Sequence, residues 1–472
     1  MNDARPPAQR PSARERARRF VAPSGPPTMP VGMRRPASGL SRQDEGAVLD
    51  MALRTGEAMI ATGAPIADAT AALHKIMDGF AVTNAQIDIT FTAITASVEH
   101  NADPVTRVRV IEDRTSDYSR LSGLVELVDD IGAGRLDIPT AQRCLDEVLT
   151  SPHPYRRWIV TLALGAMAAS ISVLFGGGWQ IALVAAGTTA IIDRALRFGR
   201  RRGLPHLFQQ VLGAMIATIV AVLLLWGQNL FGWDAQLLPS SLVVAAGIVV
   251  LLAGLSLVGA AQDAISGFPL TASARSFEVV ISTIGLVLGI AVVLDLGVRL
   301  GVPLQVVDYA AVDVSTPLRI ASGAVAAGAW AVASYTRPRV VLVVMVVAAA
   351  AMMINDAMGL LGLGPSGRAF VAALGIGVAG SVISRFRPIP VMVLAVCAIT
   401  PMLPGLTIYR AMFAITEAGS ILSGFNLLLQ AMGIGLALAA GVSLGEFVAS
   451  PSGRGAGRWQ QMLSRRASGS RI

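Results

Sequence analysis

The sequence predicts an α-helical integral membrane protein, with ten transmembrane helices as two inverted five-helix repeats and a small α+β cytoplasmic domain before them. Three observations lead to this fold class. Hydrophobic residues make up 53% of the 472 residues and charged residues only 14%, which leaves too little polar surface for a soluble protein of this length. Apolar segments long enough to cross a bilayer follow one another after residue 155. Two polar, glycine-rich stretches, one in each half of this apolar region, resemble each other.

Both ends of the chain are basic tails. Residues 1–42 are rich in arginine and proline and contain no apolar core of the kind that a secretory signal peptide needs, so we expect a disordered extension. Residues 449–472 form a second basic tail, which we place in the cytoplasm. The net charge of +8 lies largely in these tails and in short loops, which indicates orientation by the positive-inside rule and argues against nucleic-acid binding.

Residues 43–154 are expected to form the cytoplasmic α+β domain. Apolar residues recur at helical spacing in four stretches, and alternate with polar residues in two others. The predicted helices cover 48–63, 66–80, 121–131 and 139–149, and the predicted strands cover 86–98, with a bulge, and 106–111. The domain contains no G-x-S-x-G, Walker A or H-E-x-x-H motif, so no catalytic site is evident.

The membrane part divides into two halves, residues 155–300 and 301–448. Ten segments have a length near the roughly 20 residues that a bilayer core requires. They are 157–175, 179–196, 206–226, 240–260, 276–294, 316–334, 339–355, 368–384, 389–408 and 425–447. With the domain inside, ten arginines fall in inner loops and four in outer loops, which predicts that both termini are cytoplasmic.

An internal repeat relates the two halves. Gly254 to Leu257 (GLSL) matches Gly405 to Ile408 (GLTI), and Ser276-Phe277-Glu278 matches Gly424-Phe425-Asn426. The likeness extends to residues 208–223 and 370–385. Because each half has an odd number of predicted spans, the second half must enter the membrane from the opposite side. Inverted repeats of this kind are typical of carriers that work by alternating access, whereas a channel does not need them.

Three ionisable residues of the first half are candidate site residues. Placing such a group inside an apolar span costs roughly 2.5 to 3.5 kcal/mol, so its presence indicates a function. Asp263 follows Gln262 where the fourth span ends, and Glu278 is predicted in the first turn of the fifth span. Either carboxylate is suited to bind an ammonium group or exchange a proton, with Arg275 pairing with one of them or with an anionic substrate group. The alternative for Glu278 is a simple cap of the helix N-terminus.

The second half has polar and mostly uncharged counterparts of these ionisable residues. Asn426 replaces Glu278, Gln430 lies one turn further on, and Glu417 supplies a carboxylate. Pro404, with Pro401, is predicted to break the ninth span and to free carbonyl groups near Thr407. The alternatives are interhelical hydrogen bonds for the amides and a packing kink for the prolines. The acids near other span ends, Asp193 among them, are expected at the membrane interface.

We expect neither a metal nor a cofactor. The two cysteines, Cys144 and Cys397, are far apart in the sequence, and the four histidines lack ligand spacing.

Several motifs resemble those of one known family. The domain opens with RTGEAMIATGAPIADATAALHKI, FGGGW follows the first span, and GAAQDAISGFPLTASARSFE and PMLPGLTIYRAMF come later. This arrangement resembles the bacterial threonine/serine exporters, in the form that fuses both halves in one chain. The resemblance implies export of L-threonine and L-serine from the cytoplasm, driven by the proton gradient. Because protons flow inward in a respiring cell, coupling is expected to be antiport, with Asp263, Glu278 and Glu417 as candidates for protonation and Gln262, Asn426, Gln430 and Thr407 for substrate contact.

Three alternatives remain at this stage. Some relatives with separate halves resemble dicarboxylate exporters, a hydrolase could have its site in residues 43–151, and a passive pore needs no coupling ion. The expected partners are a small amino acid, protons and the lipid bilayer, without nucleic acid, and a homo-oligomer is compatible with the sequence. The expected location is the bacterial plasma membrane.

Overall fold

The computed structural model describes residues 40–449 apart from 83–84, 101–102, 113, 232–239, 252–253, 301–313, 387–388 and 417–420. The predictions for most of both tails and for Glu417 therefore lie outside the described residues.

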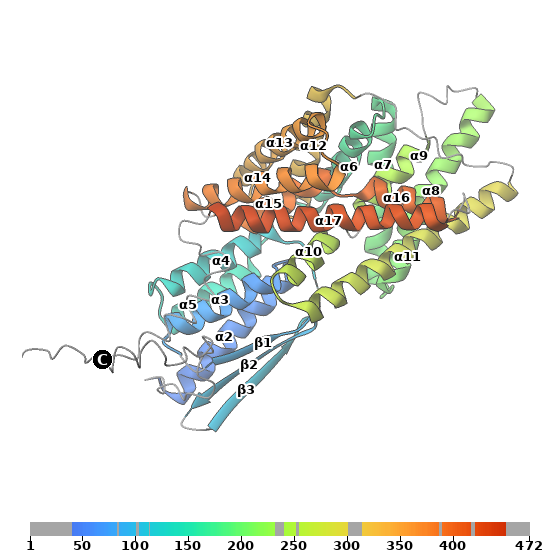
Figure 1. Cartoon of the computed structure of the whole chain (residues 1–472). Helices are drawn as coiled ribbons and strands as arrows, with labels where there is room; N and C mark the ends of the chain where they lie inside the picture. Colours follow the sequence, from blue (N-terminus) through green and yellow to red (C-terminus); the bar gives the residue numbers. More distant parts are fainter. Residues whose placement is uncertain are drawn as a thin grey trace, which may run out of the picture. The chain divides into compact units, whose positions relative to one another are not determined.

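The N-terminal domain combines helices with one antiparallel sheet. Its elements are α2 (Arg42–Ala61), α3 (Ile66–Gly79), β1 (Ala85–Ile89), β2 (Ala93–His100), β3 (Asp103–Val110), α4 (Tyr118–Gly132) and α5 (Ile138–Thr150). The strands follow the order β1-β2-β3, and α2 packs against β2 and β3 (Figure 1). The α+β prediction is therefore confirmed for this part of the chain.

One prediction for the sheet is wrong. The stretch 86–98 was expected to be a single bulged strand, but it forms β1 and β2. Thr90 makes the turn, because its N–H donates to Ala93 O at 2.9 Å and its Oγ1 accepts from Ala93 N–H at 3.2 Å. Ile89 and Ile94 pair across the hairpin and are both buried. The shift in alternation thus marks the chain reversal that keeps both isoleucines on the core side.

The membrane part contains the remaining helices. The first half has α6 (Arg157–Leu174), α7 (Trp179–Arg201), α8 (His206–Phe231), α9 (Ser240–Leu251), α10 (Gly254–Ile265) and α11 (Pro269–Arg299). The second half has α12 (Thr316–Ala333), α13 (Pro338–Leu360), α14 (Pro365–Phe386), α15 (Val391–Ile399), the 3-10 turn η1 (Thr400–Met402), α16 (Gly405–Thr416) and α17 (Ile421–Ala449).

Six of the described helices are long and apolar enough to cross a membrane: α6, α8, α11, α13, α14 and α17. The other predicted spans correspond to α7, to α12, to α9 with α10, and to α15 with α16. The structure therefore confirms a mostly helical, multi-pass protein.

One predicted span is interrupted within the described residues. The predicted break of the ninth span is confirmed, since α15 ends at Ile399, η1 follows, and α16 begins at Gly405. The fourth predicted span corresponds to α9, which ends at Leu251, and α10, which begins at Gly254. Residues 252–253 lie outside the described residues, so the continuity of this span stays a prediction.

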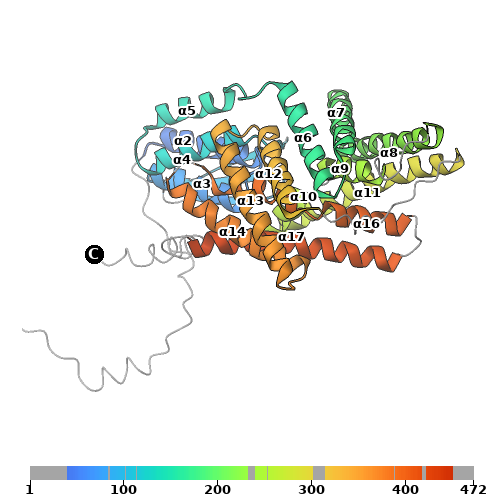
Figure 2. The ribbon, with the colours of Figure 1, turned by 90° about the horizontal axis from the view of Figure 1, so that it is seen from above.

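Glycines let two helix pairs approach closely. α8 lies along α11, and α14 lies along α17 (Figures 1 and 2). A Cβ atom placed on Gly289 of α11 would lie 2.5 Å from Val211 O of α8. One placed on Gly445 of α17 would lie 2.3 Å from Leu374 O of α14. Backbones therefore meet directly in both pairs.

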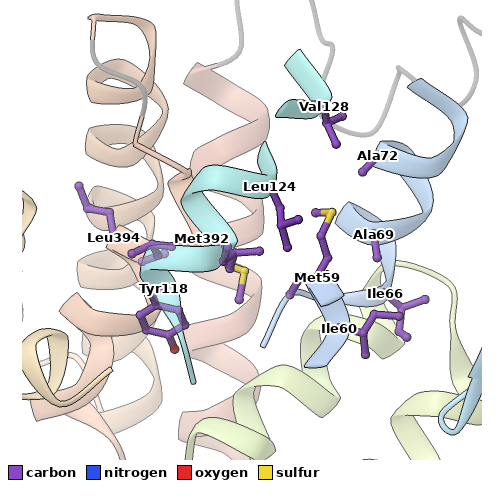
Figure 3. Close-up of a cluster of buried hydrophobic side chains, with 14 of the residues drawn as sticks. Met59, Ile60, Ile66, Ala69, Ala72, Tyr118, Leu124, Val128, Met392 and Leu394 are labelled. Carbon is purple, nitrogen blue, oxygen red and sulfur yellow. The ribbon is translucent and has the colours of Figure 1, made fainter. Parts of the chain in front are cut away.

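The core of the N-terminal domain continues into the second half of the membrane part. Met59, Ile66 and Leu124 belong to the same buried cluster as Met392 and Leu394 of α15 (Figure 3). The N–H of Tyr118, the first residue of α4, donates to Ser334 O at 2.9 Å, in the turn after α12. Glu126 of α4 forms an ion pair with Arg337 at 2.6 Å. The domain is thus packed against the helices by apolar and polar contacts together.

Candidate functional site

Asp263, near the end of α10, is the centre of the candidate site. Its side chain is fully buried, with 0% exposed, and its Oδ2 lies 3.1 Å from Arg275 Nη1 of α11. Its Oδ1 accepts a hydrogen bond of 3.4 Å from the backbone N–H of Ile66, the first residue of α3. The N-terminal domain and the membrane part therefore meet at this carboxylate.

Local sequence explains how Arg275 reaches Asp263. The chain turns sharply after α10, where Gly267 has a φ of +89°, a value that glycine adopts without strain. The Phe268 N–H donates to Asp263 O at 2.9 Å, and Pro269 then starts α11. One turn before Asp263, a Cβ atom on Gly259 would lie 2.8 Å from Arg275 Nη1. Gly259 therefore leaves the space that the guanidinium occupies.

Arg275 and the N–H of Ile66 both contact the Asp263 carboxylate but do not satisfy all of its hydrogen-bonding capacity. α3 has Pro65 at its N-cap and no side-chain cap of its own, so Asp263 supplies the acceptor from a distant helix. Removing one partner of a buried ion pair typically costs about 3 to 5 kcal/mol, because the other charge is left uncompensated. Asp263 Oδ2 nevertheless makes no hydrogen bond of good geometry within the described residues, although it is in ion-pair contact with Arg275.

Two charged residues of the N-terminal domain, Asp68 and Arg114, interact electrostatically with the Asp263 site. Asp68 lies in the first turn of α3, and desolvation followed by the charge of Asp263 raises its pKa to about 6. Arg114 precedes α4, and its guanidinium donates to Phe91 O and stacks 3.7 Å from the centre of the Phe91 ring. Burial, and next the charge of Arg275, lower the pKa of Arg114, whereas Glu278 and then Asp263 raise it.

The predicted residues of the first half fall near this cluster. Gln262 is partly exposed on α10 beside Asp263, and Glu278 is partly buried on α11, one turn after Arg275. The prediction that Glu278 lies in the first turn of its helix is wrong, because α11 begins at Pro269 and Glu278 is well inside it. Its alternative role as an N-terminal cap is therefore excluded.

The predicted residues of the second half are not in contact with Asp263 in the part of the chain that is described. Pro404 is buried just before α16, and Thr407 is partly buried in its first turn. Asn426 and Gln430 are both exposed on α17. Their roles stay predictions, as does that of Glu417, which lies outside the described residues.

A second buried polar group was not predicted. Thr161 of α6 donates from Oγ1 to Asp193 Oδ2 of α7 at 2.7 Å, and Arg197 Nη2 donates to the same oxygen at 2.5 Å. Asp193 is 8% exposed and therefore buried within the protein, whereas its expected position near the membrane interface stays a prediction. The spacing of four between Asp193 and Arg197 gave a signal for the pair, but nothing in the sequence pointed to Thr161.

No cluster of three or more histidine, cysteine or carboxylate side chains within the described ranges is arranged to hold a metal ion.

Apolar helices long enough to cross a bilayer, together with a buried aspartate–arginine pair between α10 and α11, indicate a multi-pass membrane transport protein. Comparison with known proteins identifies the family. One family model, described as "Putative threonine/serine exporter", matches residues 50–297, and a second, "Threonine/Serine exporter, ThrE", matches residues 319–448. The chain therefore belongs to the threonine/serine exporter family, and it is a multi-pass protein of the plasma membrane.

Two curated relatives match almost the whole chain. A protein of Mycobacterium tuberculosis named "Probable threonine/serine exporter" is 38% identical over 443 residues, which cover 91% of this chain and 82% of the relative. The "Threonine/serine exporter" of Corynebacterium glutamicum is 34% identical over 437 residues, covering 91% and 87%. No solved structure matches. The fused form that the sequence motifs indicated is confirmed, and the family is one of transporters.

Proposed function

We propose that this protein exports L-threonine and L-serine from the cytoplasm in exchange for protons. The observation that carries the proposal is the match to two threonine/serine exporters over 91% of the chain. The buried pair of Asp263 and Arg275 adds a chemical basis, because ionisable groups buried among membrane helices are expected at a transport site.

The geometry suggests how a proton and a substrate would compete. Ionised Asp263 is able to attract the ammonium group of the amino acid, while Glu278, one turn after Arg275 on α11, faces the same group of charges. Protonation of Asp263 from the outside removes this negative charge, and the amino acid is released there. The proton then leaves Asp263 on the cytoplasmic side, where the next amino acid binds. One proton thus moves inward for each substrate released.

Packing between the halves supports the inverted repeat. α6 and α12, the first helices of the two halves, pack along each other. Arg157 Nη1, at the start of α6, donates to the hydroxyl of Tyr335, just after α12, at 2.6 Å. The two helices therefore run in opposite directions. In addition α10 packs against α17, and α16 packs against α11 in return. Such reciprocal contacts suit two conformations of similar energy.

The remaining site predictions complete the proposal. Gln262 lies beside the ion pair, and Pro404, Thr407, Glu417, Asn426 and Gln430 would form the substrate and proton path in the second half. The excess of arginine in the predicted inner loops supports a cytoplasmic N-terminal domain and cytoplasmic termini.

The charge balance favours an amino acid over a dicarboxylate. Asp68, Asp263 and Glu278 stand against Arg114 and Arg275, so the cluster has one negative charge in excess when all five are ionised. A zwitterion is compatible with this balance, whereas a dianion meets net repulsion.

Efflux from cells loaded with labelled threonine tests the proposal. Asp263→Asn and Glu278→Gln are compared with the native chain and with Asp295→Asn, a matched control on α11 whose carboxylate is 64% exposed and pairs with Arg299. We expect at least a tenfold loss of export for Asp263→Asn and little change for the control. A protonophore should abolish export by the native chain. Unchanged export in both site variants would remove these residues from the mechanism, and export of a labelled dicarboxylate in place of threonine would replace the substrate.

A further inference from the structure

We infer that the N-terminal domain supplies two of the groups that bind the amino acid: Asp68 receives its ammonium group and Arg114 receives its carboxylate. This inference rests on the proposed function and adds to it a substrate site shared between the domain and α10–α11. Neither residue belongs to a membrane helix, and neither was predicted from the sequence.

The start of α3 is placed on the transport site by a direct contact. The Ile66 N–H reaches Asp263 Oδ1, and Asp68 is two residues further along the same first turn. Ile66 is fully buried with 0% exposed, and belongs to the apolar cluster that joins the domain to α15. The turn is therefore held by packing as well as by the hydrogen bond. Asp68 itself keeps part of its surface exposed, so a ligand can reach it, although neighbouring protein desolvates its carboxylate.

The carboxylate of Asp68 is suited to bind a cationic group of the substrate. Among the residues that the structure describes, none forms an ion pair with it, and its electrostatic neighbours are the acids Asp263 of α10 and Glu446 of α17. Protein around the side chain removes part of the solvent that would otherwise screen these charges. An ammonium group placed here relieves repulsion among acids from three different elements and gains a charge-assisted hydrogen bond.

Arg114 is the cationic side chain assigned to the carboxylate of the amino acid. Its guanidinium is fixed on one side by Phe91, through the carbonyl and the ring, and the next residue is fixed by a 2.7 Å hydrogen bond from Thr115 N–H to Ala61 O at the end of α2. A guanidinium has five N–H donors, so others remain beyond the one that Phe91 accepts. Arg275 is a like charge nearby. A carboxylate between the two arginines replaces their repulsion by attraction to both.

Binding of chemically altered substrates tests the assignment group by group. The purified full-length chain in detergent micelles is titrated with L-threonine, with N-acetyl-L-threonine, which lacks the ammonium group, and with L-threoninamide, which lacks the carboxylate. We expect the native chain to bind threonine at least tenfold more tightly than either analogue. Asp68→Asn should lose the preference over the acetylated analogue, and Arg114→Gln the preference over the amide, each to within about threefold.

Matched controls separate binding from folding. Asp44→Asn changes an acid in the first turn of α2, and Arg143→Gln changes an exposed arginine of α5. Both should retain the native preferences, and Asp68→Glu should restore most of the discrimination that Asp68→Asn loses. All variants are compared by thermal unfolding, and Asp68→Glu keeps the test decisive if Asp68→Asn fails to fold.

The outcomes are distinguishable. Native preferences in both Asp68→Asn and Arg114→Gln would overturn this inference and leave the proposed function intact. A native chain that neither binds nor exports threonine or serine would overturn the proposed function, and the shared site with it.

Discussion

At the scale of single residues, Asp193 and Arg197 show how buried charges are balanced in this protein. Thr161 and Arg197 both donate to Asp193 Oδ2, and Arg197 Nη2 also lies 2.9 Å from Thr161 Oγ1. Three groups thus satisfy one another between α6 and α7. Replacing one of them leaves a buried charge without its partner.

Arg197→Met is therefore expected to lower the free energy of unfolding by about 3 kcal/mol, and the double change Arg197→Met with Asp193→Leu should recover at least half of that loss. Equilibrium unfolding in detergent micelles measures both. Exposed Arg299, whose side chain is 74% exposed in its pair with Asp295, gives the control Arg299→Met, which should change stability by less than about 0.5 kcal/mol. Equal destabilisation by the two single changes would show that the Asp193 group is not a buried ion pair.

Asp68 gives a prediction for pH. Its pKa of about 6 lies above the ordinary aspartate value of 3.8, so the folded protein binds this proton more tightly than the unfolded chain. The favourable contribution is fully present below pH 3.8 and is lost as pH rises through about 6. Burial is the main cause, and the acids Asp263 and Glu446 act in the same direction. Asp68→Asn should raise the melting temperature at pH 7.5 relative to the native chain, and the gain should shrink near pH 5. A gain that is constant over this range would contradict the assignment.

At the scale of elements, the sequence predicted most helices but not every boundary. Periodicity placed the helices of the N-terminal domain, and Pro401 and Pro404 marked the break before α16, because proline cannot continue a helix. Helix α11 starts at Pro269, earlier than predicted, and this places Glu278 away from the helix end. Sequence reasoning found Asp263 and Arg275 because charges stand out in apolar segments. Asp68 and Arg114 look like ordinary surface residues until tertiary packing brings them to Asp263.

Helix α17 offers a test of close packing. Gly445→Ala places a methyl group against Leu374 O, where an ideal Cβ would be only 2.3 Å away, so α14 and α17 must separate. We expect a loss of roughly 1 to 3 kcal/mol in the free energy of unfolding. Gly187→Ala on α7 is the matched control, because no atom lies within 4 Å of its added Cβ. Higher helix propensity should make that variant neutral, or more stable by up to about 1 kcal/mol. Equal behaviour of the two variants in thermal unfolding would argue against a backbone contact at Gly445.

At the scale of the whole molecule, the two halves share a scaffold but not its charges. In the repeat, Asp263 aligns with Ala414, Arg275 with Ser423 and Glu278 with Asn426. The pair of Asp263 and Arg275 therefore belongs to the half in which α10 meets the N-terminal domain. Two related halves, of which one contains the buried ion pair, are consistent with a carrier that binds its substrate from one side of the membrane and releases it on the other. In the proposed mechanism, transport depends on an inverted relation of the two halves.

Labelling of cysteines tests this inversion directly. Ser266→Cys lies in the turn between α10 and α11, and Gly419→Cys lies at the equivalent place of the second half, in a background where Cys144 and Cys397 are changed to serine. Asp88→Cys, on an exposed position of β1, marks the compartment of the N-terminal domain. A maleimide that does not cross membranes should label Gly419→Cys in intact cells, whereas Ser266→Cys and Asp88→Cys should react only after permeabilisation. If residues 266 and 419 are labelled from the same side, the halves are parallel. The opposite directions of α6 and α12 would then be a local feature, and alternating access by exchange of two inverted halves would lose its structural basis.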